Sequence, residues 1–281
     1  MSVWFRNGVP VEKVSIDDRA FQYGDGLFET IAIRDGEPRL WAYHMERLAG
    51  GCARLRMTIP GRKRLRDDVA NAVLQSNELS AYCAAKLIVS TGVGQRGFGR
   101  DIPSATETVV GVFPTRPIAA QKYSGGVATI LCDTRLATNS VTAGLKTLNR
   151  LEQVLARSEC VVAGTFEGIT LDADDRLICG TMSNVFIVSN ESIVTPSLER
   201  CGVEGVMRRH TIATLRKYGI TVNIRDMSEM ELSDSDEVFL TNSQFGVLPV
   251  RSYRGKVWHS HPVTRRLMAM MADNGISECV L

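Results

Sequence analysis

One lysine stands in surroundings that suit chemistry. Lys146 lies in the segment AGLKTLNRLEQ, residues 143–153, after a glycine and before the predicted start of an amphipathic helix. The positive end of a helix dipole destabilises an ammonium ion, and a lysine that loses its proton readily can form a Schiff base. The same position also suits an ordinary surface lysine at a helix start, so the pattern by itself leaves both interpretations open.

Two further segments could bind an anion. Residues 202–208, GVEGVMR, end a loop and open a predicted helix, and free backbone N–H groups at a helix N-terminus bind phosphate. Thr241, Asn242 and Ser243 follow a predicted strand and could supply additional donors. A plain junction between a loop and a helix explains residues 202–208 equally well, so the pattern alone does not decide.

The segment GVGQRG, residues 92–97, matches the G-x-G-x-x-G pattern of dinucleotide-binding loops. That fingerprint requires a helix that begins within the motif, because its N-terminus holds the pyrophosphate. The sequence continues with FGRDIP, residues 98–103, which glycine and proline interrupt. We therefore expect a flexible loop. Its Arg96 either binds a carboxylate, the bidentate partner of a guanidinium group, or is solvated.

Strands and helices must position these residues. Short segments rich in Ile, Val, Phe and Thr predict strands in the first half, at 27–33, 85–90 and 108–113. Apolar residues at i, i+3, i+7 and i+10 from Met45 predict an amphipathic helix, and a second helix is expected at 64–75. The stretch from Pro114 to Gly126 is the best linker candidate, since prolines open it, glycines close it and no periodicity runs through it.

The second half alternates strands and helices without a strict βαβ rhythm. A helix is expected after Lys146 with Leu148, Leu151 and Leu155 on one face, and another from Gly205 to about Tyr218. Strands are predicted at 127–132, 185–189, 192–195, 222–224 and 237–241. We predict a two-domain α/β or α+β protein with mixed sheets, composed of an N-terminal α/β domain (1–115), a linker (116–126) and a C-terminal domain (127–281).

Composition excludes several classes of protein. The 281 residues are 44% hydrophobic, and 33 Lys and Arg nearly balance 31 Asp and Glu, which argues against a nucleic-acid partner. No apolar run approaches the ~20 residues that span a bilayer, and the N-terminus lacks the apolar core of a signal peptide. Seven scattered cysteines without a CxxC pair argue against a disulfide framework and a zinc site. We expect a soluble cytoplasmic protein that acts on a small molecule, without a metal, nucleic-acid or membrane partner.

Five segments together resemble one enzyme family. Residues 144–155, GLKTLNRLEQVL, resemble the lysine segment of aminodeoxychorismate lyases, which belong to the fold-type IV pyridoxal-phosphate enzymes with the branched-chain and D-amino-acid aminotransferases. Residues 18–29 resemble the N-terminal signature of that family, and 44–48 its phosphate-arginine helix. Residues 202–208 and 241–250 resemble its two remaining cofactor segments. The segments occur in the family's order and cover nearly the whole chain.

The resemblance implies a pyridoxal 5'-phosphate cofactor and assigns roles. Lys146 would be the Schiff-base lysine and would then move protons. The cofactor phosphate would be bound by Arg47, Val206, Met207 and Ser243. Asn184 would lie in the segment that runs beneath the cofactor ring, and Cys179 would stand at the position that faces the pyridine nitrogen. Family members are usually homodimers, so a homodimer is expected here. In such a dimer the site lies between the two domains, the C-terminal one holds the cofactor, and a loop reaches in from the partner subunit.

The sequence departs from the family pattern at Cys179. Relatives generally carry a glutamate five residues before the asparagine that corresponds to Asn184, and it keeps the pyridine nitrogen protonated, which strengthens the electron sink. Gly180 and Asn184 set the register of this comparison. A thiol of ordinary pKa ~8.5 cannot hold a pyridinium as a carboxylate does. An elimination whose product becomes aromatic depends less on that electron sink than transamination does. Cys179 therefore favours a lyase over an aminotransferase. The alternative interpretation is that Cys179 marks an enzyme with weakened activity.

The substrate side of the pattern also departs from D-amino-acid aminotransferases. Those enzymes hold the substrate carboxylate with a tyrosine, an arginine and a histidine, and this sequence has Phe28 and Phe98 in place of the tyrosine and the histidine. Arg96 is retained, so Phe28 and Arg96 are candidate substrate-binding residues. We predict a lyase that converts 4-amino-4-deoxychorismate to 4-aminobenzoate and pyruvate for folate synthesis. The alternatives are a D-amino-acid or branched-chain aminotransferase and a cofactor-binding protein without turnover.

Overall fold

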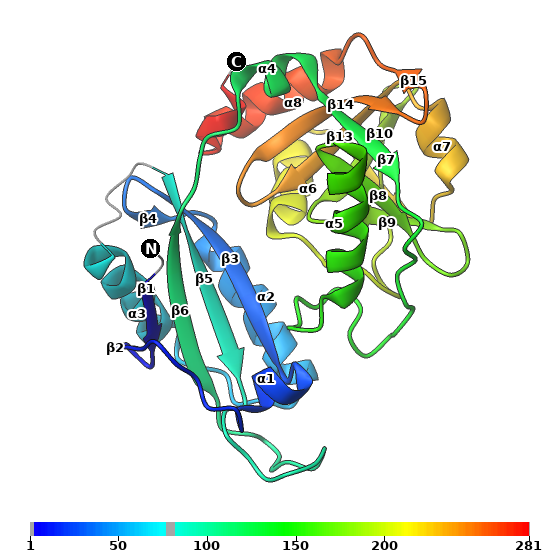
Figure 1. Cartoon of the computed structure of the whole chain (residues 1–281). Helices are drawn as coiled ribbons and strands as arrows, with labels where there is room; N and C mark the ends of the chain where they lie inside the picture. Colours follow the sequence, from blue (N-terminus) through cyan, green and yellow to red (C-terminus); the bar gives the residue numbers. More distant parts are fainter. Residues whose placement is uncertain (1–2, 77–81, 281) are drawn as a thin grey trace. The chain divides into compact units, whose positions relative to one another are not determined.

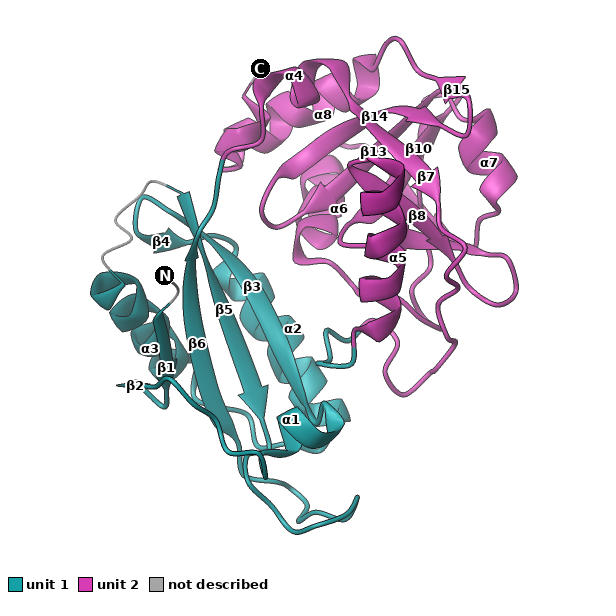
Figure 2. Ribbon diagram, viewed as in Figure 1, with its two compact units in different colours: residues 1–116, 145–149 teal, residues 117–144, 150–281 magenta. Residues whose placement is uncertain are grey.

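The structure, a computed structural model, describes residues 3–76 and 82–280. It comprises two compact units (Figure 2): unit 1 contains residues 1–116 and 145–149, and unit 2 contains 117–144 and 150–281. The chain thus returns to unit 1 for the short segment that carries Lys146. Both units combine sheets with helices (Figure 1), which confirms the expected α/β or α+β class.

Unit 1 is built on a six-stranded, wholly antiparallel sheet with the strand order β2-β1-β6-β5-β3-β4. Three of its strands follow the predicted segments closely, and its second long helix matches the one expected at 64–75. The elements in chain order are β1 (Val3–Arg6), β2 (Val9–Pro10), α1 (Arg19–Tyr23), β3 (Gly26–Arg34), β4 (Glu37–Pro38), α2 (Trp41–Arg54), α3 (Arg62–Gln75), β5 (Tyr82–Ser90) and β6 (Glu107–Pro114).

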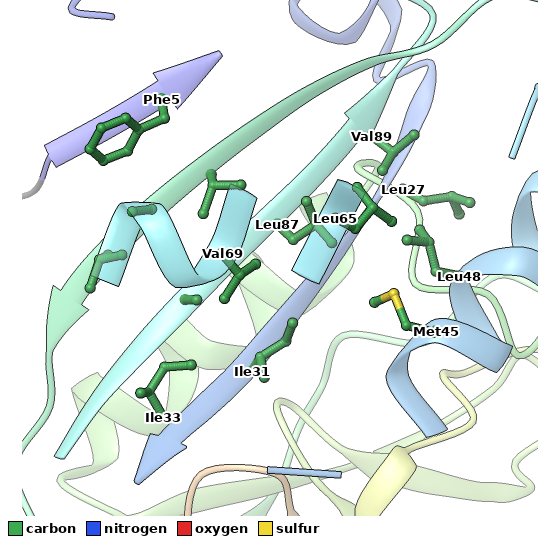
Figure 3. Packing of buried hydrophobic residues seen from close by; sticks show 14 of the residues in the cluster. Phe5, Leu27, Ile31, Ile33, Met45, Leu48, Leu65, Val69, Leu87 and Val89 are labelled. Carbon is green, nitrogen blue, oxygen red and sulfur yellow. The ribbon is translucent and has the colours of Figure 1, made fainter. Parts of the chain in front are cut away.

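One face of this sheet packs against α2 and α3 (Figure 3). Alternate residues of β3, such as Leu27, Ile31 and Ile33, are buried there together with Met45 and Leu48 of α2. The two-residue alternation of a strand and the apolar stripe of an amphipathic helix meet in one core, as the sequence pattern predicts. The same alternation places position 29, a glutamate, on this helix-covered face.

Unit 2 contains a nine-stranded mixed sheet with the order β12-β11-β10-β13-β14-β7-β8-β9, in which β15 also pairs with β14. The pairs β14–β7, β7–β8 and β11–β12 are parallel, so the predicted mixed pairing occurs in this sheet. The elements are α4 (Ala120–Gly125), β7 (Val127–Leu131), α5 (Leu151–Ala163), β8 (Glu167–Leu171), β9 (Leu177–Gly180), β10 (Asn184–Ser189), β11 (Ser192–Pro196), α6 (Val206–Lys217), β12 (Val222–Arg225), α7 (Glu229–Asp234), β13 (Glu237–Asn242), β14 (Gly246–Tyr253), β15 (Lys256–Val257), α8 (Pro262–Asp273) and the short 3-10 helix η1 (Ser277–Cys279).

The central strands of unit 2 are buried along almost every residue, because helices and loops cover both faces of the sheet. Phe186 and Phe239 of neighbouring strands stack in this core with ring centroids 4.8 Å apart. The predicted linker segment includes α4, whose Tyr123 is buried and donates a 3.0 Å hydrogen bond to the carbonyl of Phe245.

The helix after the lysine segment differs from the expectation. It begins at Leu151, so Leu148 precedes it, and Leu151 and Leu155 are exposed while Ala156 and Cys160 form its buried face. The exposed leucines therefore do not face the core of unit 2. Across residues 3–76 and 82–280, every helix is too short or too polar to cross a membrane.

Candidate active site

Lys146 lies in an extended segment beside the first residues of β3. Phe28 donates its backbone N–H to the carbonyl of Lys146 over 2.9 Å, and Leu148 donates to Gly26 over 3.0 Å. Residues 145–149 thus extend the sheet of unit 1 locally, on the edge of β3 that does not pair with β5. Backbone pairing with β3, and not a helix, determines where the lysine side chain starts.

The expected placement of Lys146 at a helix N-terminus is wrong. α5 begins at Leu151, and a helix dipole acts only within about its first turn. One neighbour of the half-buried Lys146 is the ring of Phe28, whose centroid lies 4.3 Å from Nζ. Lys86 of β5 approaches the same ring, with its Nζ 5.0 Å from the centroid. Two lysines therefore lie against Phe28, at distances typical of cation–π pairs.

Arg47, the predicted phosphate ligand, is held by a buried carboxylate. Glu29 of β3 is 1% exposed and accepts hydrogen bonds from Arg47 Nε to Oε1, over 2.8 Å, and from Arg47 Nη2 to Oε2. His44, one turn earlier on α2, places its Nδ1 2.6 Å from Oε2. Burial raises the pKa of Glu29, but Arg47 and His44 outweigh it and hold the value at about 2. Glu29 is therefore ionised at neutral pH.

The loop at residues 92–97 contains no helix, so the dinucleotide fingerprint is excluded by its context, as predicted. A buried arginine anchors this loop. Arg19 bonds Asp25 through Nε over 2.9 Å and donates from Nη1 to the carbonyl of Gly97 over 2.8 Å. Its Nη2 donates to the carbonyl of Phe98 over 3.1 Å. The side chains of Arg96 and Phe98 are exposed, so the anchored loop presents both to solvent.

Cys179 lies on β9 in the interior of unit 2. Its Sγ is 3.6 Å from Oγ1 of Thr170 on β8, and that hydroxyl also donates to the Cys179 carbonyl over 2.9 Å. Burial raises the pKa of the Cys179 thiol to about 11. The thiol is therefore neutral at pH 7. Residue 179 therefore carries no negative charge in these surroundings.

Glu167 organises the turn that follows Cys179. This fully buried carboxylate accepts bonds from the backbone N–H and hydroxyl of Thr181, from the backbone of Met182 and from the hydroxyl of Ser183, over 2.7 Å. A buried charge with several donors is rigidly held. The turn delivers the chain into β10 at Asn184.

Asn184 joins β10 to the loop in front of α6. Its Nδ2 donates to the carbonyl of Val203 over 2.9 Å, and a methyl group added at Gly205 would lie 2.0 Å from its Oδ1. The absence of a side chain at Gly205 thus allows this close approach. In the structure Asn184 therefore positions the start of α6.

The start of α6 has no side-chain cap. Its N-cap is Gly205, which offers no side chain to accept from the N–H groups of Val206 and Met207, and the first N–H groups of a helix have no partner within the helix. Arg208, buried in the first turn, donates to the carbonyl of Pro196 over 3.0 Å. The dipole, the N–H groups without a side-chain cap and this guanidinium make the helix start electropositive. Ser243 lies in the turn between β13 and β14, half-buried.

The predicted site residues thus fall into two sets, one in each unit. Unit 1 brings Lys146 and Phe28 together and contains Arg47 and Arg96; unit 2 contains Cys179, Asn184, Val206, Met207 and Ser243. Sequence reasoning missed Glu29, His44, Arg19, Glu167 and Arg208 as organising residues. Four of these residues lie within the segments that resemble the family: Arg19 and Glu29 in 18–29, His44 in 44–48 and Arg208 in 202–208. Nothing in the sequence pattern shows that these side chains are buried.

Comparisons with known proteins give consistent results. The model of the family "Amino-transferase class IV" matches residues 26–253. An aminodeoxychorismate lyase of Vibrio harveyi is 36% identical over 249 residues, covering 87% of this chain and 89% of its own. A putative branched-chain-amino-acid aminotransferase of Methanocaldococcus jannaschii is 30% identical, covering 93% and 91%. The crystal structure of 4-amino-4-deoxychorismate lyase from Pseudomonas aeruginosa superposes with a TM-score of 0.89 and 40% identity, covering 97% and 99%.

Proposed function

Because the chain belongs to the amino-transferase class IV family, we propose that it is a pyridoxal-phosphate-dependent lyase. It would convert 4-amino-4-deoxychorismate to 4-aminobenzoate and pyruvate. The observation that carries this proposal is the near full-length likeness to two lyases of that name, which is closer than the likeness to the aminotransferase. Substrate choice belongs to the site and not to the fold, so the site must support it.

The residues present fit a phosphorylated, Schiff-base-forming cofactor. Arg47 offers a guanidinium oriented by Glu29, and the uncapped start of α6 offers backbone N–H donors at Val206 and Met207. These are the groups that bind a phosphate dianion in proteins. We propose that they hold the cofactor phosphate together with Ser243, and that Asn184 acts by shaping the loop before α6.

Lys146 is the residue that would do the chemistry. When bound, the cofactor supplies an electron sink conjugated with the amino nitrogen of the substrate. The Lys146 amine would take the proton from the carbon that bears this nitrogen, and would then assist departure of enolpyruvate from the neighbouring carbon. Formation of the aromatic ring makes the release irreversible. Phe28, in contact with Lys146, would provide an apolar wall for the substrate ring.

Cys179 supports the lyase over a transaminase. Its buried thiol, with a pKa of about 11, is neutral at pH 7 and carries no charge that would hold a pyridine nitrogen protonated. Transamination would depend on a strong electron sink, whereas in elimination the leaving group carries the negative charge away. A neutral residue at this position is therefore compatible with elimination and unfavourable for transamination.

Lysine variants test the assignment directly. Purified wild-type protein is loaded with pyridoxal phosphate, its visible absorbance is recorded, and 4-amino-4-deoxychorismate is added while 4-aminobenzoate and pyruvate are measured. We expect equal amounts of both products from the wild type. Lys146→Ala should lose both the absorbance and the products. Lys86→Ala is the matched control, since Lys86 lies against the same ring, and should keep the absorbance.

The other outcomes identify the alternatives. Conversion of the cofactor to its amine form by D- or branched-chain amino acids, without release of 4-aminobenzoate, would establish an aminotransferase. Absorbance without either reaction would establish a cofactor-binding protein that lacks turnover. Loss of absorbance in Lys86→Ala and its retention in Lys146→Ala would reverse the assignment of the Schiff-base lysine.

The role of Cys179 has its own test. Cys179→Glu restores a carboxylate, and we expect half-transamination with amino acids to rise relative to lyase turnover. Cys179→Ser keeps a small neutral side chain and serves as the matched control, with an unchanged ratio. An unchanged ratio in Cys179→Glu as well would show that the charge of residue 179 does not select the reaction.

We also propose that the chain forms a homodimer in a reducing compartment. Support for the dimer comes from α5, which exposes apolar residues on one face, namely Leu151, Val154, Leu155, Val161 and Val162. Exposed apolar patches of this kind mark interfaces. Sedimentation equilibrium should give twice the chain mass for the wild type and the chain mass for Val154→Glu/Val161→Glu. Support for the compartment comes from the seven cysteines, none of which forms a disulfide.

A further inference from the structure

The cluster of Glu29, His44 and Arg47 contains a charge that the fold keeps out of water. Glu29 is 1% exposed and His44 is 0% exposed, while the side chain of Arg47 is 12% exposed. A buried carboxylate is tolerated only when it is paired and hydrogen-bonded. Both oxygens of Glu29 are bonded, one to Nε of Arg47 and the other to Nη2 of Arg47 and Nδ1 of His44.

These bonds determine the orientation of Arg47. A guanidinium group is a planar fork, so binding of Nε and Nη2 by one carboxylate sets the plane of the whole group. The carboxylate comes from β3 and the guanidinium from α2, whose packing against each other buries both. The guanidinium group of Arg47 is therefore preorganised, because Glu29 sets its orientation before any ligand binds.

His44 is the member of the cluster that has a ring nitrogen without a hydrogen-bond partner among the described residues. Its Nδ1 lies against Glu29, but its Nε2 is buried without a hydrogen-bond partner among the described residues. Burial lowers the pKa of His44, the Glu29 carboxylate raises it, and the charges of Arg47 and Lys146 lower it, with a net decrease below the usual 6.5. These are the charged groups facing the imidazole from β3, from α2 and from the segment 145–149. His44 is therefore neutral at pH 7, with its proton on Nδ1.

We propose that Glu29 and His44 are positioning residues for Arg47, and that binding of a phosphate dianion at Arg47 draws a proton from solvent onto Nε2 of His44. The proposal rests on the proposed function, which places the cofactor phosphate at Arg47. Before binding, the cationic groups of Arg47 and Lys146 oppose a third positive charge. A dianion beside Arg47 reverses the sign of the local field, so the imidazole gains an N–H at Nε2 and keeps its Nδ1 bond to Glu29.

Calorimetry of cofactor analogues tests this without any turnover. Pyridoxine 5'-phosphate and pyridoxine lack the aldehyde, so neither reacts with Lys146, and they differ only in the phosphate. Each is titrated into the full-length protein free of cofactor at pH 7.5, in buffers of low and high ionisation enthalpy. The dependence of the heat on the buffer gives the number of protons taken up per molecule bound.

We expect the wild type to take up a substantial fraction of one proton with pyridoxine 5'-phosphate and none with pyridoxine. His44→Gln should abolish the uptake while it still binds the phosphorylated probe. His259→Gln is the matched control, because His259 is exposed and belongs to unit 2, and it should behave as the wild type. Glu29→Gln should weaken binding of the phosphorylated probe about tenfold or more, the equivalent of one charge-assisted hydrogen bond, and leave pyridoxine unaffected.

A spectroscopic measurement on the wild type covers the case in which a variant fails to fold. The nitrogen-15 shift of His44 Nε2 should move from the range of an unprotonated to that of a protonated imidazole nitrogen when pyridoxine 5'-phosphate is added. Binding that depends on Arg47 but occurs without proton uptake and without this shift would overturn the inference and leave the proposed function intact. Failure of the wild type to prefer the phosphorylated probe, or an equal affinity in Arg47→Ala, would overturn both.

Discussion

Replacing Glu29 with glutamine removes one charge from the interior of unit 1 and changes almost nothing in shape. Glutamine keeps an oxygen that can accept from Arg47, but it places an amide where the second carboxylate oxygen now accepts from Arg47 and His44. Arg47 is then left with a largely buried charge and a weaker partner. Removing one member of a buried ion pair is strongly destabilising for this reason.

The size of the effect follows from the titration of Glu29. Burial raises its pKa, yet Arg47 and His44 together hold it at about 2, whereas the usual value is 4.5. A carboxyl group with a lower pKa in the folded protein stabilises the fold above its unfolded pKa, and this stabilisation is lost as the pH falls from 4.5 toward 2. At about 1.4 kcal/mol per pKa unit, the contribution at pH 7 is about 3 kcal/mol.

Urea unfolding at pH 7 and pH 3 measures this contribution. Fluorescence of Trp4 and Trp41 reports on unit 1 when Trp258 of unit 2 is replaced by phenylalanine. We expect Glu29→Gln to lower the free energy of unfolding by about 3 kcal/mol at pH 7 and by about half as much at pH 3. The difference shrinks because pH 3 lies below the unfolded pKa of 4.5 and above the folded pKa of about 2, so unfolding of the wild type takes up a proton at residue 29 and becomes more favourable as the pH falls.

A second ion pair of unit 1 provides the control. Arg6 and Glu107 are 25% and 31% exposed, so Glu107→Gln should change the free energy of unfolding by no more than about 1 kcal/mol, because solvent screens that pair. A loss below about 1 kcal/mol for Glu29→Gln at pH 7, or the same loss at both pH values, would refute the reasoning. The stability of unit 1 would then owe little to the charge on Glu29.

Glycines yield three further predictions of known direction. In α2, Gly50→Ala adds a methyl group with no atom within 4 Å and should raise the free energy of unfolding by ~0.5–1 kcal/mol. Gly51→Ala places its methyl group 2.7 Å from Leu27 Cδ1 and should lower it by ~1–3 kcal/mol; the same urea titration distinguishes the two signs. Gly205→Ala should displace the start of α6 from Asn184 and weaken binding of pyridoxine 5'-phosphate about tenfold or more, with no effect on pyridoxine, which calorimetry measures.

The sequence by itself determined the elements whose pattern is local. Strands β3, β5 and β6 and helices α3 and α6 were predictable because alternation and helical periodicity need only neighbouring residues. The family was recognisable for a related reason, since its short segments keep their residue types and their order along the chain. The absence of a carboxylate at position 179 was likewise predictable from the sequence, because a cysteine thiol is neutral where a glutamate is charged.

The tertiary structure alone decided which charges are buried and what they hold. Glu29 meets His44 and Arg47 across 15 and 18 residues of chain, and Glu167 meets Thr181 across 14. Pairing of this range depends on how a strand packs against a helix or on where a strand turns, and no periodicity in the sequence encodes it. The same holds for Lys146, which the sequence suggested at a helix start. Hydrogen bonds to β3 decide its position, and those bonds form only when residues 145–149 return to the first sheet.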